Sequence, residues 1–126
     1  ARTGGVSFSV KTVVNRINPS RLIKLKARKV DGVSNCKKIL DDLSEGNVTD
    51  ANFIEGMGCV GGCVGGPRTI IDADKATQIV NEVAEDSLIM TPFDNLNVMK
   101  IFKNLGINAI EEIMENPEIV QLLTRE

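Results

Sequence analysis

The chain has 126 residues, of which 42% are hydrophobic and 25% charged, and its net charge is −2. This size suits one globular domain or part of one. The absence of histidine excludes His-based zinc sites, Ser-His-Asp triads and imidazole acid–base catalysis. No apolar run approaches the roughly 20 residues of a membrane-spanning helix, so we expect no membrane contact and a cytoplasmic location. Four Phe without Trp or Tyr argue against base stacking and hence against nucleic-acid binding.

The charge is unevenly distributed. Residues 1–38 carry ten Lys or Arg and one acidic residue, a net +9, whereas residues 39–126 carry five basic and sixteen acidic residues, a net −11. Two interpretations are open. The halves pack together and neutralise each other, or the basic region forms a surface that attracts an acidic partner. The sequence begins with Ala rather than Met, which predicts a piece of a longer protein.

The first half predicts two helices and two strands. Apolar residues at helical spacing indicate a helix over 4–18. Alternation of apolar and basic residues over 22–30 indicates a strand with one solvent-exposed face. Asp31–Gly32 predicts a turn into a helix over 33–46, with Ser34 or Asn35 as its cap and Gly46 at its end. A short strand over 51–57 follows. The apolar face of the second helix contains Cys36, Ile39, Leu40 and Leu43, so we expect Cys36 to belong to the core.

The second half predicts helices only. One begins near Asp72 and ends before Pro92, and another runs from about Asp94 to Leu105, closed by Gly106. Asn108 with Glu111 resembles a capping box. Asn116 with Pro117 predicts a cap for a last short helix over 118–123. The expected fold class is α/β, with a small sheet, several packing helices and a helical C-terminal part.

A glycine-rich loop holds two of the three cysteines. In EGMGCVGGCVGGP, residues 55–67, six of thirteen residues are glycine and the two cysteines, Cys59 and Cys63, are four positions apart. A dinucleotide-binding G-x-G-x-x-G requires a helix that starts inside the motif, and a phosphate-binding P-loop requires Lys-Ser/Thr after the glycines. Neither follows here. The third thiol of a radical-enzyme C-x-x-x-C-x-x-C motif is also missing, because position 66 is Gly.

Four interpretations of the loop stay open: a zinc site, a disulfide, a turn whose cysteines merely pack, and an iron–sulfur site. Zinc normally takes four ligands and the loop supplies two, while disulfides are rare inside cells. Iron–sulfur clusters prefer thiolates. Glycines let the backbone approach a bulky cluster closely and point N–H groups at it as an anion nest. We therefore favour an iron–sulfur site, although such clusters normally take four thiolates.

The same residues resemble a family signature. FIEGMGCVGGCVGGP is similar to the third signature of the iron-only hydrogenases, Glu-x-Met-x-Cys-x-x-Gly-Cys followed by glycines and a proline. TGGV at 3–6 and GVSN at 32–35 follow the family's order upstream, so the resemblance covers about residues 1–71. The matching signature positions are Glu55, Met57, Cys59, Gly62, Cys63, Gly66 and Pro67.

The resemblance implies a role for each loop residue. Cys59 and Cys63 would be metal ligands of the 4Fe–4S part of the catalytic H-cluster, and the Cys63 sulfur would bridge to its diiron subcluster. Met57 would pack beside the diiron unit, and Gly62 would line the cofactor. The implied reaction is the reversible conversion of two protons and two electrons to H₂. The implied electron carrier is a ferredoxin-like acidic protein, for which the basic N-terminal region is a candidate docking surface.

The departures from the family pattern limit this expectation. The two earlier signatures, which hold the other cluster ligands, are absent from the sequence, and the glycine run after Cys63 is shorter than usual. We therefore expect residues 1–71 to be the C-terminal part of a hydrogenase active-site domain and residues 72–126 a helical extension. The remaining N-terminal part of the same protein would be its partner. Alone, the chain should hold no stable H-cluster, show no activity and associate into dimers.

Two other functions are consistent with the sequence. The first is a non-catalytic hydrogenase-like iron–sulfur sensor or assembly protein. The second is a metal-free interaction module whose acidic helical tail binds a partner.

Overall fold

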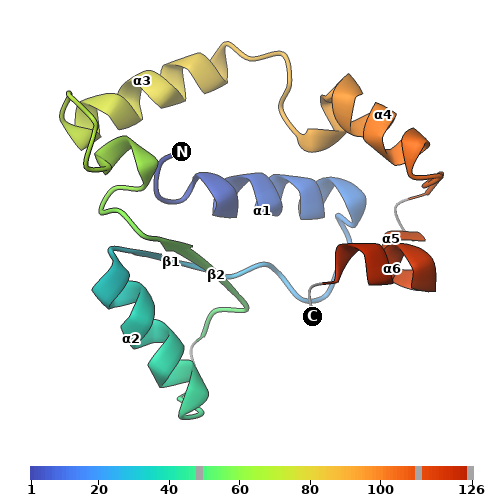
Figure 1. Cartoon of the computed structure of the whole chain (residues 1–126), viewed down its shortest axis with the longest axis horizontal. Coiled ribbons are helices and arrows are strands. Elements are labelled where there is room, and N and C mark those ends of the chain that lie inside the picture. The colour runs from blue at the N-terminus through green and yellow to red at the C-terminus, as the bar shows by residue number, and fades with distance from the viewer. Residues whose placement is uncertain (48–49, 110–111, 125–126) are drawn as a thin grey trace. The chain divides into compact units, whose positions relative to one another are not determined.

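The computed structural model describes residues 1–47, 50–109 and 112–124, and these form two compact units, residues 1–88 and 89–126. Helices and one parallel sheet make up the fold, which confirms the predicted α/β class (Figure 1). The family boundary predicted between residues 71 and 72 stays a prediction. The two compact units divide between residues 88 and 89, which is a boundary in packing and not in family.

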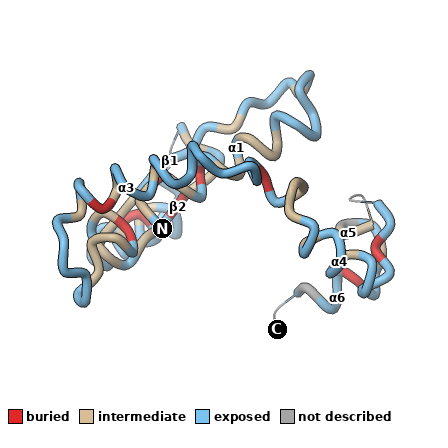
Figure 2. The backbone as a smooth tube through the Cα atoms, turned by 90° about the horizontal axis from the view of Figure 1, so that it is seen from above, coloured by how far each residue is buried: buried red, intermediate tan, exposed pale blue. Residues whose placement is uncertain are grey.

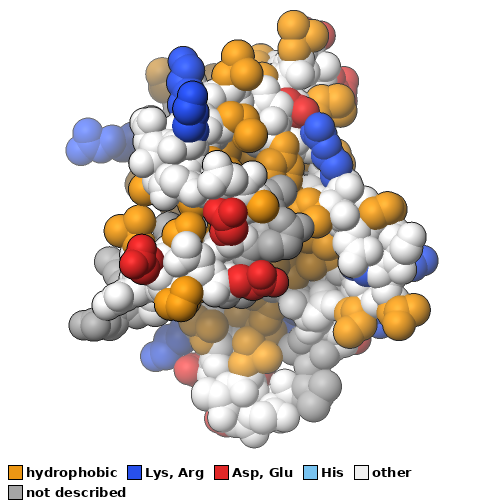
Figure 3. Space-filling view, turned by 90° about the vertical axis from the view of Figure 1, so that its right-hand side faces the viewer, with side chains coloured by type: hydrophobic (Ala, Val, Ile, Leu, Met, Phe, Trp, Pro, Cys, Tyr) orange, Lys and Arg blue, Asp and Glu red, His pale blue; other side chains and the backbone are white. Residues whose placement is uncertain are grey.

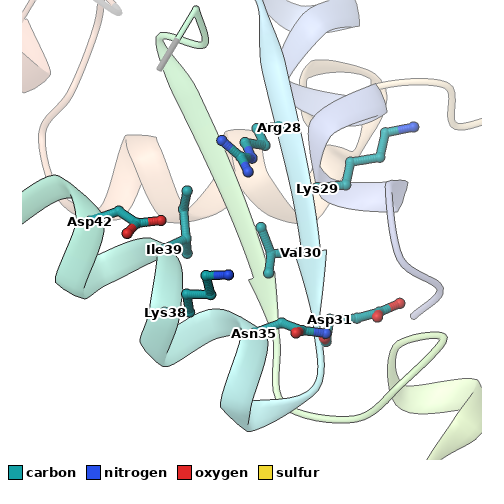
Figure 4. Close-up of a pocket in the computed structure, with 8 residues that line it drawn as sticks. All are labelled: Arg28, Lys29, Val30, Asp31, Asn35, Lys38, Ile39 and Asp42. Atoms are coloured by element: carbon teal, nitrogen blue, oxygen red, sulfur yellow. The ribbon is translucent and has the colours of Figure 1, made fainter. Parts of the chain in front are cut away.

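A β–α–β unit forms the centre of the first unit. Strand β1 (Ala27–Asp31) and strand β2 (Phe53–Met57) pair in parallel, and helix α2 (Val33–Ser44) lies between them in sequence. The register runs from Ala27 opposite Phe53 to Asp31 opposite Met57. Helix α1 (Gly5–Ile17) and α2 lie on opposite faces of the strands (Figures 1 and 4). Side chains alternate along a strand, so β2 presents Glu55 to α1 and its neighbours to α2.

The predicted strand over 22–30 is wrong in its first half, because β1 begins only at Ala27. The side chain of Asn52 ends the backbone ladder: its Oδ1 accepts from the Lys26 N–H at 2.8 Å, and its Nδ2 donates to the Lys24 carbonyl at 3.0 Å. In the described part of the chain, residues 22–25 pair with no strand. Ile23 is consequently 75% exposed instead of facing a core.

Helix α2 matches the predicted range but not the predicted cap. Gly32, with φ at +79°, stands at the N-cap, and neither Ser34 nor Asn35 caps the helix. The Asn35 amide instead donates to the Asp31 carbonyl at 2.9 Å. Of the predicted apolar face only Ile39 is buried, at 4% exposed, whereas Leu40 is 62% exposed.

Helix α3 (Ala73–Glu85) begins as predicted, with Asp72 as its cap. The Asp72 carboxylate accepts from the N–H groups of Asp74 and Lys75 at 2.9 and 3.3 Å. The prediction that Pro92 ends this helix is wrong. The helix ends at Glu85, and Pro92 instead begins the 3₁₀ turn η2 (Pro92–Asp94), a position that tolerates a missing N–H.

The second unit consists of helices and is described by itself. After η2 come α4 (Leu96–Asn104), α5 (Glu112–Glu115) and α6 (Pro117–Leu123). Gly106, with φ at +71°, follows α4 as predicted, and the side chain of Asn116 caps α6, because its Oδ1 accepts from the Glu118 N–H at 3.0 Å. The predicted capping box of Asn108 falls partly on Glu111, which lies outside the described residues.

Little apolar surface is buried in either unit. Among the described residues the buried hydrophobic side chains are Ile39 and Ala76 in the first unit and Ile107 and Ile119 in the second (Figure 2). Figure 3 shows hydrophobic side chains reaching the surface between the charged ones. In the parts of the chain that the structure describes, no helix combines the length and apolar character needed to cross a bilayer.

Candidate functional site

The cysteine loop follows the carboxyl end of β2. In a parallel sheet the carboxyl ends of neighbouring strands meet at one edge, so Asp31 of β1 and Met57 of β2 end side by side. Residues 58–67 continue from this edge and include the 3₁₀ turn η1 (Cys63–Gly65), which packs against α3. Ligands of open α/β sheets bind preferentially at such edges.

The N-terminal segment packs directly against this loop. Arg2 forms an antiparallel bridge with Gly62, the Thr3 N–H donates to the Gly61 carbonyl at 3.0 Å, and the Val64 N–H donates to the Ala1 carbonyl at 3.2 Å. A Cβ at Gly62 would lie 2.7 Å from the Thr3 nitrogen. Gly62 also has φ at +88°, a conformation that only glycine adopts readily. The structure therefore gives Gly62 a packing role.

Asp31 joins the sheet edge to both segments. Its Oδ2 accepts from the Thr3 hydroxyl and from the Gly61 N–H, each at 3.0 Å. Arg2 extends the connection to α3, because its Nε donates to Asn81 Oδ1 at 2.5 Å. Strand β1, the N-terminal segment and α3 are thus held around the loop. The sequence predicts only a turn at Asp31 and does not indicate that its carboxylate supports the loop.

Glu55 is a buried carboxylate at the start of α1. It is 4% exposed, and its two oxygens accept from the Gly4 N–H and the Ser7 N–H, each at 2.8 Å, and from the Ser7 hydroxyl. These N–H groups belong to the first turn of α1. The N–H groups of a first turn have no acceptor within the helix itself. A negative charge there also interacts favourably with the helix dipole. Glu55 of β2 therefore serves as the cap of α1.

The hydrogen bonds set the ionisation state of Glu55. Burial by itself would raise the pKa of this carboxyl, but the hydrogen bonds from Ser7 and Gly4 outweigh burial, so the pKa lies below its ordinary value of 4.5. Glu55 is thus a carboxylate at neutral pH. It matches the family signature position, yet residue patterns alone did not predict this structural role. The one signal was an acidic residue in an otherwise apolar strand.

The two loop cysteines are free thiols. Cys59 is half-buried and Cys63 is exposed at the first position of η1. A Cβ at Gly66 would lie 3.8 Å from the Cys59 sulfur, so the backbone of Gly66 runs beside this thiol. Because neither thiol is bonded to the other, the structure contains no disulfide at this loop. Met57 is the last residue of β2, two positions before Cys59, and its side chain is half-buried.

The Cys36 sulfur makes its hydrogen bonds with the strands of the sheet. Its sulfur donates to the Met57 carbonyl at 3.4 Å and lies 3.8 Å from the Val30 carbonyl. A Cβ at Gly56 would lie 3.5 Å from the same sulfur. Cys36 therefore packs between α2 and the sheet, as its helical spacing predicted, although it is half-buried rather than fully buried.

The expected anion nest is wrong for five loop residues. The N–H groups of Gly61, Gly62, Val64, Gly65 and Gly66 all donate within the chain, to Asp31 Oδ2 and to the carbonyls of Cys59, Ala1, Gly62 and Cys63. A Cβ at Gly65 would lie 2.0 Å from the Val60 carbonyl oxygen. These glycines are needed because backbone packs on backbone inside the loop.

The donor set fits half of an iron–sulfur ligand shell. Cys59 and Cys63 supply two thiols of the type that iron–sulfur clusters prefer. Among the described residues, no group of three or more Cys, Asp or Glu side chains gathers around a common point. The loop can therefore supply two ligands, and a complete set needs two more.

A hollow lies between β1 and α2 and is lined by none of the loop cysteines. Its volume is about 330 Å³, and Figure 4 shows Arg28 and Lys38 on the α2 side of β1 and Lys29 on the other side. Asp31 and Asp42 also line it, so both signs of charge are present. This mixed lining makes it a weak candidate for a charged ligand.

Comparison with known families matches this part of the chain. A family model described as iron only hydrogenase large subunit, C-terminal domain, matches residues 3–67. The match covers just over half of the chain and contains helix α1, the β–α–β unit and the cysteine loop. No curated protein matches the chain.

Proposed function

The chain belongs to the family of the iron-only hydrogenase large subunit, C-terminal domain, and we propose from this premise that its loop supplies two thiolates to an iron–sulfur H-cluster. The family makes an oxidoreductase of the hydrogenase type the best assignment for the intact protein. The observation that carries the proposal is the match over residues 3–67, which spans both loop cysteines.

The loop geometry supports binding by Cys59 and Cys63. Both thiols are free, and the loop that carries them is fixed by Asp31, by the N-terminal segment and by α3. Ligands held in advance bind with less ordering cost. Met57 would stand beside the cofactor as a polarizable neighbour. Because Gly66 has no Cβ, it adds no side chain beside the Cys59 sulfur.

The cofactor would supply the electron storage and the open iron site for the conversion of two protons and two electrons to H₂. The residues of this chain hold and orient it. Cys63, with its exposed thiol, would bind the 4Fe–4S part and bridge to the diiron part, while Cys59 would bind the 4Fe–4S part alone. The other two thiolates would come from the N-terminal part of the same protein. A ferredoxin-like carrier would deliver the electrons.

Hydrogen turnover by the intact, matured protein tests this function. The protein is purified without oxygen and assayed for H₂ evolution with a reduced dye, alongside Cys63→Ser and Cys36→Ser. We expect turnover in the parent protein and in Cys36→Ser, because Cys36 on α2 packs against the sheet, and none in Cys63→Ser. An iron-loaded parent protein without turnover would contradict catalysis and favour the sensor or assembly role.

A further inference from the structure

We propose that Cys59 and Cys63 also form a redox-active dithiol, which a small organic disulfide oxidises reversibly to an intramolecular disulfide when no cluster is bound. The structure shows both thiols free and therefore represents the reduced form. The formation of this disulfide does not depend on the proposed hydrogen chemistry. Its consequence rests on the proposed function: a thiolate binds metal and a disulfide sulfur does not, so oxidation would close the loop to the cluster.

The backbone folds Cys63 back toward Cys59. The Cys59 carbonyl accepts from the Gly62 N–H at 3.0 Å, so residues 59–62 form a turn, and Cys63 follows that turn directly. The Cα atoms at the two ends of such a turn lie less than about 7 Å apart. Disulfides join residues whose Cα atoms are about 4.4–6.8 Å apart. The turn therefore brings Cys63 close to the separation that a disulfide spans.

The Cys59 sulfur lies beside the 3₁₀ turn that Cys63 begins. A Cβ placed on Gly66 would be 3.8 Å from this sulfur and 3.1 Å from the Cys63 carbonyl oxygen, so both atoms lie within 4 Å of one point. The Gly66 N–H donates to the same Cys63 carbonyl at 3.1 Å and keeps this turn closed. Because residue 66 is glycine, it adds no side chain at the point where the Cys59 thiol approaches the backbone of Cys63.

Anchors on the loop hold the two thiols in the same place. Gly61, between the cysteines, donates to Asp31 Oδ2 and accepts from the Thr3 N–H, each at 3.0 Å. Val64, directly after Cys63, donates to the Ala1 carbonyl at 3.2 Å. Groups held near each other in this way react at a much higher effective concentration than free groups do. The folded loop should therefore favour a bond between its own thiols over bonds to other molecules.

The different exposure of the two thiols sets the order of the reaction. Cys63 is exposed and Cys59 is half-buried, so a bulky oxidant reaches Cys63 first. The Cys63 thiolate attacks one sulfur of the small disulfide, whose S–S bond breaks, and one thiolate of the oxidant leaves. The Cys59 thiolate then attacks the Cys63 sulfur of this mixed disulfide, and the second thiolate leaves. The chain loses two electrons and two protons, and the oxidant becomes two thiols.

Cys36, the third thiol, takes no part in this reaction. Its sulfur donates to the Met57 carbonyl at 3.4 Å and lies 3.8 Å from the Val30 carbonyl, so it is held against the sheet. Cys36 is therefore the matched control for both loop cysteines.

The exposure of Cys63 also determines what kind of disulfide this is. Permanent disulfides are rare inside cells, whereas transient, redox-sensing ones do occur there. Exposed disulfides belong to the labile type, which small thiols reduce again. Because one of the two sulfurs is exposed, we expect a reversible bond that follows the ratio of small thiols to small disulfides around the protein.

Equilibration of the metal-free full chain with glutathione buffers of increasing oxidised fraction tests the proposal. Free thiols are then alkylated after an acid quench and counted by intact and peptide mass spectrometry. We expect Cys59 and Cys63 to become protected together, with no glutathione retained, and Cys36 to stay alkylated. In concentrated urea the same change should need about tenfold more oxidised glutathione, because unfolding removes the anchors of the loop. Glutathione retained on Cys63, or equal midpoints with and without urea, would overturn the proposal.

Single Cys→Ser variants test which thiols react. Cys59→Ser should retain one glutathione on Cys63, because no second thiol is left to displace it. Cys63→Ser should take up glutathione several-fold more slowly, since Cys59 is half-buried. Cys36→Ser should have the midpoint of the parent chain within about twofold. Loss of the disulfide in Cys36→Ser would identify Cys36 as a partner and overturn the proposal, and equal uptake by the two loop variants would overturn Cys63 as the point of attack.

Iron uptake separates this proposal from the proposed function. The intact protein, either reduced or oxidised beforehand with glutathione disulfide, is incubated without oxygen with ferrous iron and sulfide. We expect the oxidised protein to take up several-fold less iron until a dithiol is added. Equal uptake would refute the closing of the loop by oxidation. No uptake by the reduced protein would contradict the proposed function, whereas the mass spectra of the metal-free chain decide by themselves whether the disulfide forms.

Discussion

At the scale of single residues, Glu55 connects the fold to the site. Its position in β2 is two residues before Met57 and four before Cys59, and its carboxylate binds the first turn of α1. The same residue therefore fixes where α1 begins and how the strand leading to the cysteine loop lies against it. A carboxylate at this point replaces the Ser, Thr, Asp or Asn that usually caps a helix from its own sequence.

Replacing Glu55 by Gln should destabilise the first unit by about 1–3 kcal/mol. Gln keeps the shape but loses the charge and places an NH₂ group against the donors of Ser7 and Gly4. Urea unfolding followed by circular dichroism measures the change. Glu82→Gln, on the exposed side of α3, is the matched control and should be near neutral. Equal effects of the two substitutions would show that Glu55 is no cap.

The lowered pKa of Glu55 also predicts a pH dependence. Because its pKa in the folded chain lies below the ordinary 4.5, the unfolded chain takes up the proton first on acidification. The contribution of Glu55 is thus present above about pH 4.5 and lost as the pH falls through the folded-state pKa. The stability difference between the parent chain and Glu55→Gln should stay constant above about pH 5 and shrink as the pH falls below about 4.5. A difference that stays constant below about pH 4.5 would contradict the assignment.

At the scale of elements, the cysteine loop and the N-terminal segment form one packed unit. Gly62→Ala should separate them, because the new Cβ meets the Thr3 nitrogen at 2.7 Å and φ is +88°. We expect a loss of about 1–3 kcal/mol and faster hydrogen exchange of the Thr3 amide, which donates to Gly61. Gly58→Ala, with no atom within 4 Å, is the control in the same loop. Unchanged exchange at Thr3 would refute this packing.

The elements that the sequence predicts well are those with local signals. Helices α1, α2 and α3 follow apolar periodicity, and the caps Asp72 and Asn116 follow from their residue types. Strand β1 was predicted five residues too early, because its start depends on the side chain of Asn52 on another segment. Pairing of distant segments leaves no periodic signal, so this boundary could not be predicted from residues 22–30 alone.

The candidate site was likewise predictable from the sequence only in part. The spacing of Cys59 and Cys63 indicates thiolate ligands and the family signature from sequence alone. Their actual support was not predictable, since Asp31, Arg2 and Asn81 come from three separate elements. The packing of Gly62 and Gly65 against other backbone segments was not predictable for the same reason. Gly62 and Gly65 admit other backbone segments, a requirement that only the folded chain reveals.

At the scale of the whole molecule, the sparse core predicts association. Leu22, Ile70 and Leu88 are nearly fully exposed in the first unit, while only a few described hydrophobic side chains are buried. Exposed apolar side chains lose their contact with water when chains associate, which favours association. We expect this chain on its own to bind a hydrophobic dye and to form larger species as concentration rises, measured by sedimentation. A dye-free monomer at all concentrations would contradict this prediction.

The proposed function requires that Cys59 and Cys63 bind iron. Iron and acid-labile sulfide are therefore counted per chain in the anaerobically purified intact protein and in the three single Cys→Ser variants. We expect a loss of cluster iron in Cys59→Ser and Cys63→Ser and parent-like iron in Cys36→Ser, whose thiol contacts the Met57 carbonyl instead. Parent-like iron in both loop variants, or an iron-free parent protein, would refute iron binding by the loop.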